Sequence, residues 1–239
     1  MRKSVCLLAG VLVLQIFLYN VYAGESDTRL FQVSTIAALK QGKYDGRLSF
    51  GELRKHGDFG IGTLNGLNGE MVAVGGQFYQ VTIDGRVHRI GDGEKTPFAL
   101  VLFFDHAKAV ALDGKLNMKS LEETLDRQLP SLDRIWAIRL KGLFPNLTVR
   151  SVAEQHRPYP PLEKALEGQR EFRLENSSGT LVGFRFPRFM AGVNVSGYHF
   201  HYIDREGHRG GHVLDFIATN PRLEALEVTD FVLRFSGNN

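Results

Sequence analysis

Hydrophobic and polar positions change period along the chain, and these changes predict short helices followed by many strands. Residues 34–42, STIAALKQG, favour a short helix that begins at Ser34, and Ser49 with Glu52 has capping-box spacing before a second short helix. From 58 to 87, short apolar runs are separated by Asn-Gly, Gly-Gly and Asp-Gly pairs. Because such pairs form tight turns, this region is predicted to be a β-meander.

The rest of the chain reads mainly as strands. The uninterrupted apolar run at 97–104, PFALVLFF, predicts a strand that is buried on both faces. Ser120 and Glu123 repeat the capping-box spacing before a stripe of leucines that Pro130 ends, which predicts a longer helix. The other predicted elements are two strands within 135–154 joined by a turn at 142–146, a short helix at 162–166, and antiparallel strands from 172 to 235.

This succession of elements predicts an α+β protein. The proline-rich stretch at 158–161 is the best boundary between two sheet-based halves that pack together. We therefore expect residues 24–157 to form an N-terminal half and residues 158–239 to form a C-terminal half.

Residues 1–23 are predicted to be a secretory signal peptide. They begin with Arg2 and Lys3, continue with an apolar run from 5 to 18, and end with small residues around a tyrosine. An uncleaved anchor is the alternative, but the apolar run is short for a membrane span. We therefore expect an exported protein, periplasmic or secreted, whose mature chain begins near Gly24.

Composition narrows the function classes once the signal is set aside. Loss of its two cations lowers the formal net charge from +3 to +1, and no run of Lys or Arg is longer than a pair. Nucleic acid is therefore not an expected partner. Cys6 is the only cysteine and lies in the signal, so a disulfide framework is excluded. A second long apolar segment is missing, so no membrane association is expected after cleavage.

Three histidines near the C-terminal end have the spacing of a metal site. His199 and His201 are two residues apart, so on a strand both rings would point to the same side. A turn through residues 204–207 would bring His212 alongside them on the returning strand. Three imidazoles without a fourth protein ligand leave a coordination position open, which is typical of catalytic zinc.

Two other interpretations of these residues stay open. A lone His-x-His pair is more often a feature of a strand surface than a metal site. A cupin-like metal oxygenase also uses such a pair, usually with a carboxylate a few residues later, and Asp204 and Glu206 are the candidates.

The histidine segment 197–216, GYHFHYIDREGHRGGHVLDF, resembles the metal-binding signature of the α-acetolactate decarboxylase family. Further blocks resemble this family in the same order, and together they cover nearly everything from Leu30 to Phe216. These blocks are HGDFGIGTLNGLNGEMVAVGGQFYQV at 56–81, KTPFALVLFF at 95–104, IRLKGLFPNLTVRSV at 138–152 and QHRPYPPL at 155–162.

The resemblance implies both an architecture and a reaction. The fold would be an N-terminal mixed β-sheet with helices and a C-terminal, largely antiparallel sheet that holds zinc, usually in a homodimer. The reaction would be the decarboxylation of 2-acetolactate, a 2-hydroxy-3-keto acid, to acetoin and CO2. Zn2+ would act as a Lewis acid on the hydroxy-ketone and stabilise an enediolate.

The resemblance also assigns site residues. His199, His201 and His212 match the metal ligands, Glu70 and Arg150 match the catalytic residues, and Thr63 is a weaker candidate for the pocket wall. Glu70 could act as a base on the substrate hydroxyl or donate a proton to carbon. Arg150 could hold the carboxylate or stabilise the enediolate charge.

One departure from the family pattern supports an alternative function. Family members carry a C-terminal extension with a second glutamate, whereas Asn239 follows His212 by 27 residues. The alternative is an exported metal-containing binding protein of the same fold with reduced or lost turnover.

Overall fold

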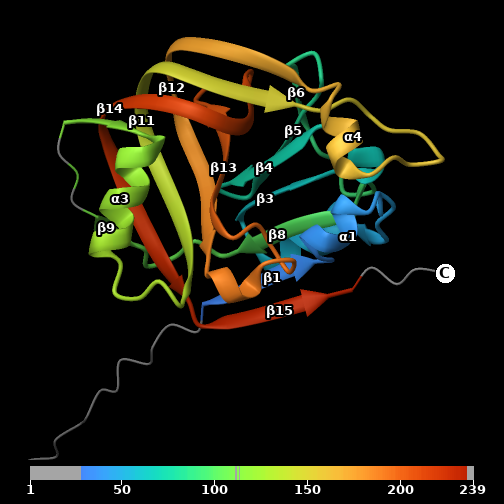
Figure 1. The fold of residues 1–239 in the computed structure, drawn as a ribbon, viewed down its shortest axis with the longest axis horizontal. Helices are drawn as coiled ribbons and strands as arrows, with labels where there is room; N and C mark the ends of the chain where they lie inside the picture. The colour runs from blue at the N-terminus through green and yellow to red at the C-terminus, as the bar shows by residue number, and fades with distance from the viewer. Residues whose placement is uncertain (1–27, 111, 113, 236–239) are drawn as a thin grey trace, which may run out of the picture.

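Two β-sheets make up most of the fold of the computed structural model, which describes residues 28–110, 112 and 114–235 (Figure 1). The predicted signal peptide at 1–23 lies outside the described residues. No helix in the described part of the chain is long and apolar enough to span a membrane. The α+β class predicted from the sequence is confirmed.

The first sheet has seven strands and is mixed. All its neighbouring strands pair antiparallel except β1 and β15, which are parallel. In spatial order the strands are β15 (Asp230–Arg234), β1 (Arg29–Val33), β8 (Phe98–Leu102), β3 (Phe59–Thr63), β4 (Glu70–Val74), β5 (Gln77–Val81) and β6 (Val87–Arg89). The predicted β-meander is therefore confirmed as β3 to β6.

The second sheet has six strands, and all of its pairings are antiparallel. Four of them form a closed circuit, because β11 pairs with β12, β12 with β13, β13 with β14, and β14 again with β11. These strands are β11 (Ile135–Ser151), β12 (Arg170–Phe186), β13 (Gly197–Asp204) and β14 (Gly210–Val228); the short strands β9 (Lys108–Val110) and β10 (Lys115–Asn117) pair with β14.

Helices are short and cover the sheets, with a separate pairing of β2 (Leu48–Ser49) and β7 (Lys95–Thr96). The α-helices are α1 (Ile36–Lys40), α2 (Phe50–Leu53), α3 (Met118–Gln128) and α4 (Leu162–Leu166), and the 3-10 helices are η1 (Arg54–His56), η2 (Asn65–Leu67) and η3 (Arg188–Met190). Asn117 caps α3 in a capping box with Ser120, so the predicted box of Ser120 with Glu123 was wrong by one turn. Similarly, Thr35 rather than Ser34 caps α1.

Strand β8 explains how the two sheets share a core. All five of its residues are buried, as the uninterrupted apolar run predicts. Its side chains alternate between two clusters. Leu100 and Leu102 belong to the core shared with Val182 and Phe184 of the second sheet, whereas Val101 belongs to the cluster under α2. The first sheet is therefore covered on both faces.

Two strand predictions differ from the structure. Residues 135–151 form one strand, β11, and not two strands joined by a turn at 142–146. The Gly and Pro residues in this region instead accompany register shifts at Lys141/Leu143 and Leu143/Asn146, where the strand bulges without reversing. The final strand, β15, leaves the antiparallel set and joins the first sheet.

The sheets divide the chain at a different place from residues 157 and 158. The chain passes from the first to the second sheet between β8 and β9, at residues 103–107. The proline-rich stretch at 158–161 is instead a connection within the second sheet, between β11 and β12. Because residues of β11 pair with residues 19 to 93 positions later in the chain, local composition did not indicate which sheet it joins.

Candidate metal centre and its cavity

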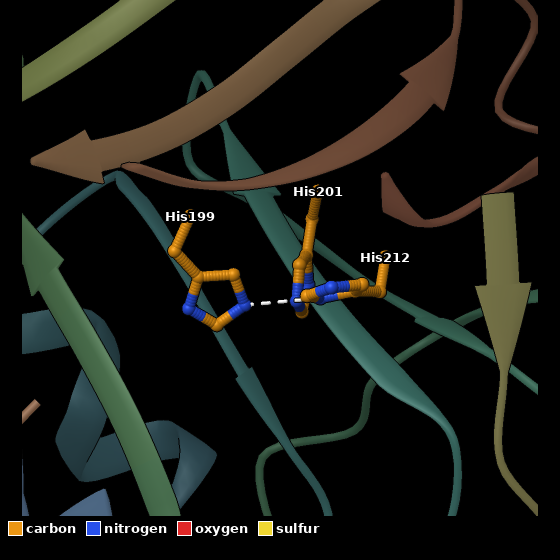
Figure 2. A group of neighbouring side chains, drawn as sticks. All are labelled: His199, His201 and His212. Atoms are coloured by element: carbon orange, nitrogen blue, oxygen red, sulfur yellow. Dashed lines mark hydrogen bonds between the residues drawn. The ribbon is translucent and has the colours of Figure 1, made fainter. Parts of the chain in front are cut away.

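The three histidines come together at the β13–β14 hairpin. His199 and His201 lie on one side of β13, and His201 is the direct cross-strand partner of His212 on β14. One ligand nitrogen from each ring lies within 4.8 Å of the others. The rings lie beside one another in Figure 2, with centroids 4.8 to 5.3 Å apart.

The turn of this hairpin is held by Asp204. Its carboxylate accepts hydrogen bonds from the His208 backbone N–H at 2.7 Å and from Arg209 Nε at 3.2 Å. Asp204 therefore closes the turn and does not face the histidines, and Glu206 is exposed in the same turn. Neither residue supplies the carboxylate that a cupin-like site needs.

Hydrogen bonds fix part of the orientation of the rings. His201 Nδ1 lies 2.8 Å from the carbonyl oxygen of Met71 on β4. A carbonyl only accepts, so Nδ1 carries the proton and Nε2 is left with its lone pair. His199 Nε2 lies 3.0 Å from His212 Nδ1, and His199 Nδ1 is buried without a partner in the described structure.

All three imidazoles are held in the neutral form that binds metals. Burial lowers the pKa of His199 to about 4, with a further contribution from the positive charge of Arg150. Burial also lowers the pKa values of His201 and His212 well below the ordinary value, and neighbouring histidines add to the effect. Protonation of these nitrogens is therefore unfavourable at neutral pH.

This donor set fits a metal ion. Two imidazole nitrogens that share a tetrahedral zinc lie about 3.3 Å apart, since each Zn–N bond is about 2.0–2.1 Å. The 3.0 Å between His199 Nε2 and His212 Nδ1 is close to this separation. Three nitrogens leave a fourth position for a substrate or water.

Glu70 and Arg150 form an ion pair beside the histidines. Arg150 lies on β11 as the cross-strand partner of His212, whereas Glu70 begins β4 in the first sheet. Arg150 Nη1 donates to Glu70 Oε1 at 2.9 Å, and the other carboxylate oxygen lies 3.4 Å from His201 Nε2. Burial raises the pKa of Glu70 to about 6, although the positive charge of Arg150 opposes the rise. Glu70 is therefore between a cation and one imidazole of the candidate metal site, with its carboxyl able to change protonation near neutral pH.

The backbone before Glu70 is fixed by Thr63 and Gly69. Thr63 is the cross-strand partner of Glu70, and its hydroxyl donates to the carbonyl of Gly69 at 2.6 Å. Gly69 has φ +78°, and a Cβ there would lie 2.2 Å from the carbonyl oxygen of Val81. A glycine is therefore required at the turn that brings Glu70 to the site.

These groups share one cavity of about 240 Å3. All six residues assigned from the family resemblance line it, including Thr63. Sequence reasoning missed the Met71 carbonyl, because a backbone group leaves no mark in the sequence, and it missed Lys40 and the apolar wall. The wall consists of Ile36, Leu39, Leu67, Phe98, Val152, Leu162, Leu166 and Val195.

Comparison with known proteins gives the same family as the sequence blocks. The family model described as alpha-acetolactate decarboxylase matches residues 30–239. The chain belongs to this family. An alpha-acetolactate decarboxylase of Methylococcus capsulatus is 46% identical over 197 residues, which are 82% of this chain and 76% of the relative. One from Methanosarcina mazei is 45% identical over 204 residues, or 85% of this chain and 70% of the relative.

Solved structures of the family have the same fold. The alpha-acetolactate decarboxylase of Bacillus subtilis strain 168 superimposes with a TM-score of 0.84 at 36% identity, covering 88% of this chain and 90% of that one. A Staphylococcus aureus protein, described as of unknown function and similar to this enzyme, gives a TM-score of 0.85 at 30% identity, with the same coverage of both chains. The two-sheet architecture is therefore a property of the family.

Proposed function

We propose that this protein is a zinc-dependent acetolactate decarboxylase that converts 2-acetolactate to acetoin and CO2. One observation carries the proposal: three neutral imidazoles lie in the same cavity as a buried Arg–Glu pair, in a chain of this family. The neutral donors and the open fourth position are suited to zinc, and His199, His201 and His212 would hold it. When bound, zinc would supply Lewis-acid chemistry to the hydroxyl and ketone oxygens of the substrate.

The protein's own groups have definite tasks in this reaction. The bond between C2 and the carboxylate carbon breaks and CO2 leaves. The electron pair of that bond moves toward the ketone oxygen, and an enediolate forms. Arg150 has a positive charge with 14% of its side chain exposed, so it stabilises this developing negative charge in a site of low dielectric. Because negative charge develops on the ketone oxygen only as the bond breaks, this contribution favours the transition state over the substrate.

Glu70 moves the proton. As a carboxylate it takes the proton of the substrate hydroxyl, or as a carboxylic acid it delivers a proton to the former C2, which gives acetoin. The ion pair with Arg150 fixes one carboxylate oxygen and leaves the other near His201. The apolar wall of the cavity excludes water from the carbon that is protonated.

The test is acetoin formation from racemic 2-acetolactate by the zinc-loaded protein. We expect turnover that a chelator abolishes, that added zinc restores, and that His201→Ala lacks. His208→Ala is the matched control, because His208 is exposed in the turn of the same hairpin and should leave activity unchanged. Binding of substrate without release of CO2 would refute the proposal and favour the metal-containing binding protein.

We also propose that the protein is exported and forms a homodimer. The charged start, apolar run and small-residue end of residues 1–23 support export, and the family resemblance supports the dimer. Secretion assays with N-terminal sequencing should find a mature chain that begins near Gly24. Light scattering during gel filtration should give twice the mass of the mature chain.

A further inference from the structure

Lys40 is a cation in the wall of the cavity that contains the histidines. It is the last residue of α1, a helix that buries Ile36 and Leu39 in the core. Lys40 itself is exposed, yet it lines the same cavity as Arg150 and Glu70. Its ammonium group is therefore placed where the cavity meets solvent.

The charge of Lys40 is not balanced within the cavity. Among the described residues that line it, Glu70 is the only carboxylate, and Arg150 already engages it at 2.9 Å. In the described part of the chain, no ion pair or side-chain hydrogen bond involves Lys40. Because the Arg150–Glu70 pair is neutral overall and the histidines are uncharged, Lys40 gives the metal-free cavity a net positive charge, to which a bound zinc ion would add.

An excess positive charge at the entrance distinguishes substrate from product. The acid that enters carries a carboxylate, whereas the hydroxy-ketone and CO2 that leave are neutral. When apolar walls focus the electric field of a cation, the cation raises the local concentration of an anion and does not retain a neutral product. A cation that held the carboxylate tightly at the reacting centre would oppose its loss as CO2, so the entrance is the useful place for it.

We propose that Lys40 is a capture and positioning residue that draws the carboxylate of the incoming 2-hydroxy-3-keto acid into the cavity. This inference rests on the proposed function, because that function supplies the anionic substrate. Lys40 acts on the second-order rate constant kcat/KM and not on the chemical step.

The kinetic test compares Lys40→Gln with the zinc-loaded wild type. We expect kcat/KM to fall roughly three- to tenfold at low ionic strength, with kcat unchanged. The difference should vanish near 1 M salt, where the Debye length is about 3 Å. Lys40→Arg should restore the wild-type value, because it keeps the charge. Lys115→Gln is the matched control, since Lys115 is exposed on β10 and does not line the cavity.

Three results would overturn the inference: an unchanged kcat/KM at low salt, an equal fall in Lys115→Gln, or a lower kcat with an unchanged KM.

Calorimetry distinguishes failure of the inference about Lys40 from failure of the proposed function. Zinc-loaded wild type and Lys40→Gln are titrated with anionic 2,3-dihydroxy-2-methylbutanoate and with neutral acetoin. Weaker binding of the anion alone in Lys40→Gln supports the inference even without turnover, whereas equal binding of the anion in both proteins contradicts it.

Discussion

Substitution of Gly211 by alanine should both destabilise the fold and weaken the metal site. Gly211 has φ +140°, which L-residues rarely adopt, and a Cβ there would lie 2.6 Å from the carbonyl oxygen of Arg150. To reach an ordinary contact of 3.4 Å, β14 and β11 must separate by about 0.8 Å, the difference between the two distances. Backbone strain costs about 1–3 kcal/mol and overpacking costs another 1–3 kcal/mol, so we expect a total of about 2–6 kcal/mol.

The Gly211→Ala substitution should also weaken zinc binding, because His212 directly follows Gly211 and pairs with Arg150 across the strands. A displaced ligand should weaken zinc affinity roughly 10–100-fold, as loss of supporting contacts does in other sites. Zinc affinity is measured by competition with a chromophoric chelator. Stability is measured by urea unfolding of the metal-free protein, with fluorescence of Trp136, the only tryptophan, as the probe.

Gly75→Ala is the matched control for this prediction. Gly75 also has a positive φ of +57°, but nothing lies within 4 Å of a Cβ there. Only the left-handed conformation should then cost free energy, about 1–2 kcal/mol. If Gly211→Ala is no more destabilising than Gly75→Ala and binds zinc normally, the close approach of the strands is not what positions His212.

Three other predictions concern ion pairs and a helix cap. Arg150→Met should destabilise the fold by about 3–5 kcal/mol and abolish acetoin formation, because it leaves the Glu70 carboxylate buried without its partner; adding Glu70→Gln should recover stability, measured by urea unfolding, but not activity. The hydrogen bond from Arg139 lowers the pKa of Glu224 below 4.5, so this pair stabilises the fold above that pH and its contribution is lost as pH falls through the lowered pKa. Unfolding midpoints at pH 7 and pH about 3.5 should therefore differ less in Glu224→Gln than in wild type, and an equal difference would contradict this reasoning. Asn117→Ala should lower the stability of the protein by about 1 kcal/mol through loss of the α3 cap, measured as a shift of the thermal unfolding midpoint, and an unchanged midpoint would refute the role of the cap.

Local sequence patterns were sufficient to predict that the three histidines come together. His199, His201 and His212 lie within one hairpin, so the strand period and a turn rich in glycine indicate their convergence. The meander and the buried strand β8 were predictable for the same reason, because each depends on neighbours close in sequence.

Distant pairings were not predictable from patterns alone. Glu70 and Arg150 are 80 residues apart and lie in different sheets, and only the family resemblance linked them. Lys40 carries no signal, because a lysine at the end of a short helix is ordinary until the opposite wall of its cavity is known. Register shifts in β11 absorb the Gly and Pro residues that indicated a turn.

The parallel pairing of β1 with β15 has a consequence for the completion of the first sheet. Arg29 faces Asp230, so the first of the described strands is covered at this edge by a strand 201 positions later in the chain. Until β15 docks, this edge of β1 offers unpaired backbone groups to any other extended chain. The docking of β15 is therefore the step that protects the sheet against misassembly.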